Sequence, residues 1–75
     1  SVSNLQLAWY EHRHGQLQGA ITRYQQALRD DHFELSRKKR AEVWMNMAVA
    51  YRDLGDTLNA QLCAQQAEEL ESQGQ

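Results

Sequence analysis

The chain has no proline, four glycines and a single cysteine among its 75 residues. Because proline interrupts helices and glycine weakens them, their scarcity together with ten glutamines favours a helical domain. Cys63 has no second cysteine to pair with, so an internal disulfide is excluded and nothing indicates an oxidising compartment. We therefore expect an all-α chain in a cytoplasmic setting.

Long apolar runs and an excess of positive charge are also missing. No uninterrupted apolar segment approaches the roughly 18 residues that a membrane span needs, and no signal peptide is visible. The formal net charge is -2, whereas domains that bind nucleic acid or membrane surfaces through their overall charge usually carry a marked basic excess. The sequence thus predicts a soluble chain that binds neither nucleic acid nor a membrane.

Motifs for catalysis are absent from the sequence as well. It contains no glycine-rich phosphate loop, no nucleophile elbow and no spaced carboxylate pair with a histidine. His12 and His14 point to different faces of a helix, and His32 has no histidine or cysteine close by in sequence. Cys63 lies on an apolar helical stripe, where a thiol behaves as a small hydrophobe. We predict no catalytic activity, no cofactor and no metal site.

What the chain does contain is an internal repeat. Residues 4–31 align with residues 44–71 at an offset of 40. The identities fall on small residues, where two helices must touch, and on a glycine that ends a helix. They pair Ala8, Gly15, Ala20, Gln25, Gln26 and Ala27 with Ala48, Gly55, Ala60, Gln65, Gln66 and Ala67. This distribution is typical of a repeated helix hairpin.

Hydrophobic periodicity predicts four helices, which we place at residues 3–14, 16–29, 36–54 and 56–70. Gly15 and Gly55 end the first and third helices, and Ser3, Ser36 and Asp56 are N-cap candidates. The third helix is apolar at almost every position from 43 to 51, so we expect it to be central and covered on more than one side.

Three local expectations accompany this assignment. Gly19 weakens the second helix locally, which indicates close contact with another helix rather than a break. Residues 30–35 form the connection between the repeats, with Phe33 and Leu35 tucked beneath it. Residues 71–75 have nothing apolar to bury and should fray.

The repeats resemble the tetratricopeptide repeat (TPR) family. The second repeat fits the family pattern at Trp44, Met47, Ala48, Tyr51, Gly55, Ala60 and Ala67. The first fits at Leu7, Ala8, Gly15, Ala20, Ile21, Tyr24, Ala27 and Leu28. It departs where Asn4 replaces the tryptophan and Glu11 the tyrosine. The 40-residue period exceeds the usual value of about 34 and is similar to the long repeats of cell-polarity proteins, kinesin light chains and bacterial quorum regulators.

The resemblance implies a fold and a binding face. The fold is a single domain over residues 1–75, with two antiparallel helix hairpins stacked as a right-handed α-solenoid. Repeat one covers about 3–31, the connection about 30–36 and repeat two about 36–72. The first helices of the hairpins would line a concave face that binds a peptide or a partner helix. By register, this face consists of Leu5, Gln6, Trp9, His12, Arg13, Glu42, Met45, Asn46, Val49 and Arg52.

Two residues of this face bear on the kind of ligand. Asn46 stands where many peptide-binding members hydrogen-bond the ligand backbone. Leu5 and Trp9 stand where members that hold chaperone tails have a lysine and an asparagine, which disfavours that ligand. The apolar residues of the face either contact a partner directly or are covered by a neighbouring helix or a dimer mate.

A run of four basic residues begins the third helix, where the helix dipole disfavours cations. Nearby acidic residues can neutralise it, or it docks an acidic peptide or a phosphate-bearing partner. The basic residues are Arg37, Lys38, Lys39 and Arg40, and the acidic ones are Asp30, Asp31, Glu34 and Glu42.

Together these features predict a non-catalytic module for protein–protein interaction and self-association. Two repeats are fewer than the roughly three that usually stabilise a stack, so we expect a homodimer or neighbouring repeats in a longer protein. A start at Ser1 without an initiator methionine fits a piece of such a protein. The alternatives are a monomeric peptide receptor that uses the concave face, and a regulatory segment of a larger enzyme or transcription regulator.

Overall fold

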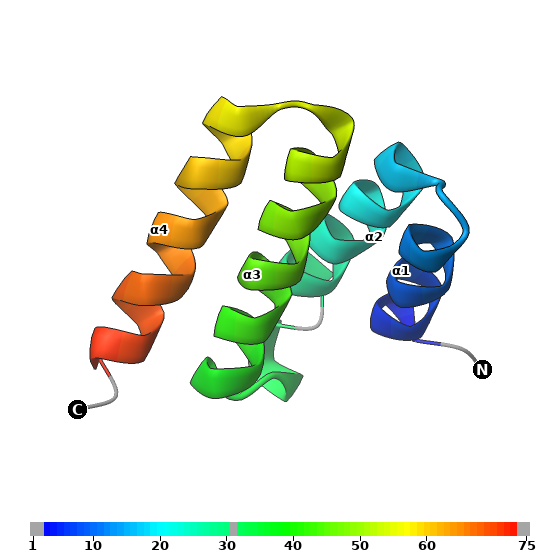
Figure 1. The fold of residues 1–75 in the computed structure, drawn as a ribbon. Coiled ribbons are helices and arrows are strands. Elements are labelled where there is room, and N and C mark those ends of the chain that lie inside the picture. Colours follow the sequence, from blue (N-terminus) through cyan, green and yellow to red (C-terminus); the bar gives the residue numbers. More distant parts are fainter. Residues whose placement is uncertain (1–2, 31, 74–75) are drawn as a thin grey trace.

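The computed structural model describes residues 3–30 and 32–73 (Figure 1). These residues form four α-helices, one 3-10 turn and no strand, which confirms the all-α class. The elements are α1 (Asn4–Arg13), α2 (Leu17–Asp30), η1 (His32–Glu34), α3 (Arg37–Leu54) and α4 (Thr57–Gln73). Each predicted helix is present, with its ends within a few residues of the predicted ones.

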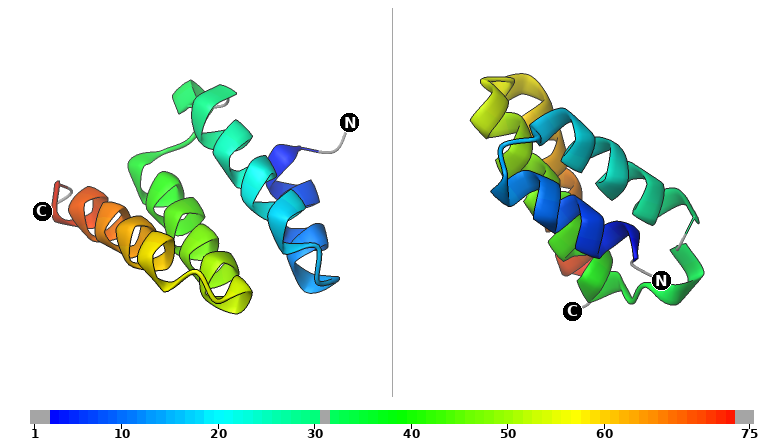
Figure 2. Two further views of the ribbon diagram at one scale, coloured as in Figure 1. Left: turned by 90° about the horizontal axis from the view of Figure 1, so that it is seen from above. Right: turned by 90° about the vertical axis from the view of Figure 1, so that its right-hand side faces the viewer.

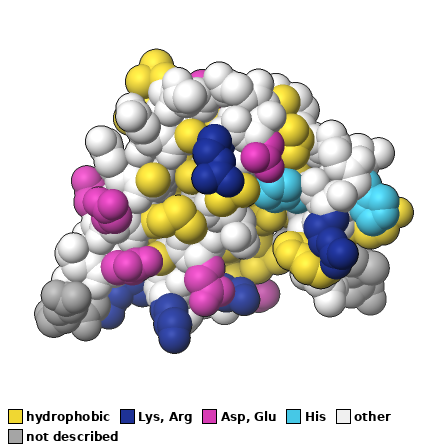
Figure 3. Space-filling model, viewed as in Figure 1, with side chains coloured by type: hydrophobic (Ala, Val, Ile, Leu, Met, Phe, Trp, Pro, Cys, Tyr) yellow, Lys and Arg dark blue, Asp and Glu magenta, His cyan; other side chains and the backbone are white. Residues whose placement is uncertain are grey.

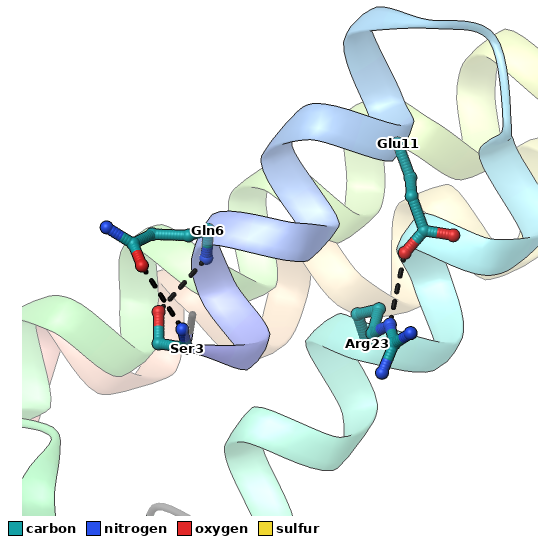
Figure 4. A network of polar contacts seen from close by, with 4 residues as sticks. All are labelled: Ser3, Gln6, Glu11 and Arg23. Carbon is teal, nitrogen blue, oxygen red and sulfur yellow. Dashed lines mark hydrogen bonds and ion pairs between the residues drawn. The ribbon is translucent and has the colours of Figure 1, made fainter. Parts of the chain in front are cut away.

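Side-chain caps fix where three of the helices begin. Ser3 and Gln6 form a capping box, in which the Ser3 hydroxyl accepts from the Gln6 backbone N–H at 3.2 Å and Gln6 Oε1 accepts from the Ser3 backbone N–H at 3.1 Å (Figure 4). The Ser36 hydroxyl accepts from the Lys39 backbone N–H at 3.0 Å. The Asp56 carboxylate accepts from the Asn59 backbone N–H at 3.1 Å. The predicted N-caps are therefore confirmed.

Glycines end α1 and α3 as predicted. Gly15 has a φ of 79° and Gly55 a φ of 87°, in the left-handed region that favours glycine after a helix. Gly19 has a different role, because a Cβ atom there would collide with the carboxylate of Glu11. The expected close contact between the first two helices is thus confirmed.

The helices pack in chain order, so that α1 contacts α2, α2 contacts α3 and α3 contacts α4 (Figures 1 and 2). The third helix therefore lies between two others, as its apolar surface predicts. Small side chains let the backbones approach, because five of the completely buried residues are alanines. Those alanines are Ala8, Ala20, Ala27, Ala50 and Ala67, and the larger core residues are Ile21, Tyr24, Val43 and Met47.

Two expectations, one about the connection after α2 and one about the end of α4, are wrong. Phe33 is fully exposed, because it lies on the short 3-10 turn η1, whereas Leu35 is half-buried. Residues 71–73 do not fray but continue α4, since residues 57–73 contain no glycine or proline that would end the helix. The fate expected for residues 74 and 75 lies outside the described residues.

Candidate interaction face

A groove with a volume of about 230 Å³ lies between α1 and α3. We call it the α1/α3 groove. Its walls combine apolar side chains with amides and one pair of opposite charges. It is lined by Leu5, Gln6, Trp9, Tyr24, Lys39, Glu42, Val43 and Asn46.

The α1 wall presents an exposed aromatic side chain. Trp9 is 56% exposed, although Ala8 beside it is completely buried against the core. The Arg13 guanidinium carbon lies 4.7 Å from the centre of the Trp9 ring, which is a cation–π contact. Leu5, one helical turn before Trp9, is half-buried. This wall can therefore contact an apolar partner while Arg13 stays in water.

The α3 wall presents Asn46, which is exposed and makes no hydrogen bond to the described residues through its side chain. Met45 and Val49 lie outside the groove lining, and Met45 is 40% exposed. Arg52, also outside the lining, is exposed. Figure 3 shows hydrophobic side chains across the middle of one face of the molecule, with charged side chains among and around them. The structure thus gathers Leu5, Gln6, Trp9, Glu42 and Asn46 round one groove. The other residues predicted for this face, His12, Arg13, Met45, Val49 and Arg52, do not line it.

His12 joins α1 to α3 rather than lining the groove. Its Nε2 atom lies 3.2 Å from Asp53 Oδ2, and its ring meets the Tyr24 ring edge-on with centroids 6.5 Å apart. The sequence does not predict Asp53 as a site residue. The two residues lie 41 positions apart, and nothing in the sequence signals that they meet.

Tyr24 reaches the groove from α2, which lies behind the space between α1 and α3 (Figure 1). The residue is 1% exposed, and its hydroxyl is buried without a hydrogen-bond partner among the described residues. Burial also raises the pKa of this hydroxyl above its ordinary value, so it remains a neutral donor at pH 7. Sequence reasoning assigned Tyr24 to packing alone and did not predict that its hydroxyl lacks a hydrogen-bond partner among the described residues.

The basic run is only partly neutralised. Lys39 Nζ lies 3.3 Å from Glu42 Oε2, and Arg40 Nη1 donates to the Leu35 carbonyl at 2.7 Å. Asp30 pairs with Arg29 instead, at 3.1 Å. The structure gives no ion pair within 4 Å to the exposed Arg37, Lys38 and Glu34, and Asp31 lies outside the described residues.

A second groove, of about 400 Å³, lies over α3 between α2 and α4. Its floor includes Trp44 and Tyr51, and Gln25 Nε2 donates to the Tyr51 hydroxyl at 3.4 Å. Cys63 also lines it, but burial and then the charge of Asp56 raise the pKa of the thiol. The thiolate that nucleophilic chemistry needs is thereby disfavoured.

The described residues form no cluster of three or more histidine, cysteine, aspartate or glutamate side chains that could hold a metal ion. Within the same part of the chain, no helix combines the length and apolar character needed to cross a membrane. The chain matches no protein-family model, no curated protein and no solved structure.

Proposed function

We propose that the chain is a non-catalytic module for protein–protein interaction and self-association, built as two antiparallel hairpins in a right-handed TPR-like solenoid. The in-register repeat supports this architecture, because its identical alanines Ala8, Ala20, Ala27 and Ala67 are buried between helices. The successive packing of α1 to α4 is also what such a stack requires. The lone Cys63 favours a cytoplasmic setting.

The observation that carries the proposed function is the exposure of large apolar side chains beside the α1/α3 groove. Trp9 is 56% and Met45 40% exposed, although smaller side chains on the same helices are buried. Aromatic residues and methionine are enriched in protein interfaces, and contiguous exposed apolar surface usually marks one. The partner is therefore a protein, and a second copy of the chain is the first candidate.

Sedimentation velocity at several concentrations tests self-association. We expect the wild-type chain to shift from monomer to dimer within the micromolar range. The double variant Trp9→Ala, Met45→Ala should stay monomeric, because each truncation removes apolar contact area. Tyr10→Ala is the matched control, since Tyr10 is also 56% exposed but stacks on His14 and does not line the groove. A wild-type chain that is monomeric throughout this range would contradict the proposal.

A monomeric peptide receptor is the second candidate. It is supported by Asn46, whose exposed amide can both donate to and accept from a peptide backbone. If the chain proves monomeric, Asn46→Ala should abolish the capture of a peptide partner while leaving the far-ultraviolet circular dichroism unchanged. Retention of the peptide by this variant would exclude Asn46 from the binding site.

A further inference from the structure

A stripe of exposed side chains runs along α4. Leu58 is 67% and Leu62 50% exposed, and Gln65 and Glu69 continue the same face at helical spacing. We call these four residues the α4 stripe. At the aligned positions of the first repeat the chain has Gln18, Thr22, Gln25 and Arg29. The two leucines are therefore not a requirement of the repeat.

α4 and the first turn of α3, which lies beside the α1/α3 groove, differ in charge. The fourth helix contains no lysine or arginine, and the structure gives no ion pair within 4 Å to its glutamates. The first turn of α3 is entirely basic, and Lys39 from this turn lines the groove. The chain thus carries two surfaces of opposite charge.

We infer that the α4 stripe of one copy docks into the α1/α3 groove of a second copy. The stripe leucines lie against the exposed Trp9 of the α1 wall. Gln65 follows them along the helix, toward the Lys39 end of the groove. This inference rests on the proposed self-association and names the two surfaces that meet.

The charged end of the stripe fixes its direction. Glu69 lies one helical turn beyond Gln65, and Lys39 lies two turns before Asn46 on α3. Docking with Glu69 toward Lys39 brings the acidic end of α4 to the basic start of α3, where Arg37 and Lys38 are exposed. The opposite direction would place the leucines at the basic turn.

Analytical ultracentrifugation of matched variants tests the inference. The double variant Leu58→Gln, Leu62→Gln should raise the dissociation constant about tenfold or more, because burial of two leucines is lost. Leu54→Gln, a change at an exposed leucine outside the stripe, is the control. Circular dichroism checks that each variant is folded.

Mixing experiments separate this arrangement from others. The Trp9→Ala variant has a truncated groove wall and an intact α4 stripe. The Leu58→Gln, Leu62→Gln variant has an intact groove and an altered stripe. A mixture of the two should therefore form heterodimers more tightly than either variant self-associates. If the mixture associates no better than its components, the inference is overturned.

A charge exchange gives a second route that leaves the core untouched. Glu69→Lys should weaken association, and mixing it with a Lys39→Glu chain should restore association. Glu71→Lys, which changes an exposed glutamate outside the stripe, should have little effect. If the wild type self-associates but the leucine and Glu69 variants associate equally well, only the docking inference fails. A wild-type chain that never associates refutes the proposed function as well.

Discussion

At the scale of single residues, the buried Tyr24 hydroxyl lowers the stability of the folded chain. A buried hydroxyl without a partner destabilises a folded chain by about 1–3 kcal/mol. Tyr24→Phe removes the hydroxyl and keeps the ring, so we expect the free energy of unfolding of the monomer to rise by about 1 kcal/mol. Urea denaturation at a concentration where the chain is monomeric measures the change. A clear loss of stability would mean that the hydroxyl is hydrogen-bonded in the folded chain.

The sequence predicted several residues that line the α1/α3 groove, but it did not predict the state of the Tyr24 hydroxyl. The resemblance to the repeat family implied one face that includes Leu5, Gln6, Trp9, Glu42 and Asn46, and these five residues do line one groove. The absence of a hydrogen-bond partner for the Tyr24 hydroxyl among the described residues was not predictable. Helical periodicity indicates that the ring is buried, but it does not indicate whether an acceptor lies near the hydroxyl.

At the scale of the helix, the start of α4 depends on the charge of Asp56. Its carboxylate accepts from the Asn59 side chain at 2.7 Å and from the Asn59 backbone N–H at 3.1 Å. These two hydrogen bonds hold the pKa of Asp56 below its ordinary value. The stabilisation is therefore complete above the unfolded-state pKa of about 4 and is lost as the pH falls through the lower folded-state pKa.

Asp56→Asn tests this dependence, because an asparagine still caps the helix but carries no charge at any pH. We expect a lower urea midpoint than that of the wild type at pH 7 and a smaller difference at pH 3. Gln61→Asn is a control for an exposed substitution on the same helix. An equal difference at both pH values would show that the charge of Asp56 does not contribute.

Helix boundaries were predictable where a side chain or a backbone requirement ends the helix. The serine and aspartate caps and the glycines at 15 and 55 all act as their residue types predict. Glu11 shows the opposite case. It replaces the tyrosine of the repeat pattern, and in the structure Glu11 Oε1 pairs with Arg23 Nε at 3.1 Å between α1 and α2 (Figure 4). A mismatch in the repeat alone did not reveal this compensating ion pair.

At the scale of the whole molecule, the order of packing followed from the sequence, whereas contacts between distant residues did not. The apolar surface of residues 43–51 required a helix covered on two sides, and α3 lies between α2 and α4. The contact between His12 Nε2 and Asp53 Oδ2 joins α1 to α3. Each of these side chains is polar and unremarkable in its own helix, so only the three-dimensional arrangement brings them together.

If self-association stabilises the folded chain, its melting temperature depends on concentration. A partner that binds only the folded state adds free energy of unfolding as its concentration rises. For a dimer of this size, a hundredfold rise in concentration adds about 1.4 kcal/mol per chain, which corresponds to about 5–10 °C. Thermal unfolding followed by circular dichroism from 1 μM to 100 μM, on the order of the concentrations at which weak dimers form, measures the shift.

The double variant Trp9→Ala, Met45→Ala is the control and should melt at one temperature across this range. A wild-type melting temperature that is equally constant would show that the apolar side chains beside the α1/α3 groove do not bind a second copy.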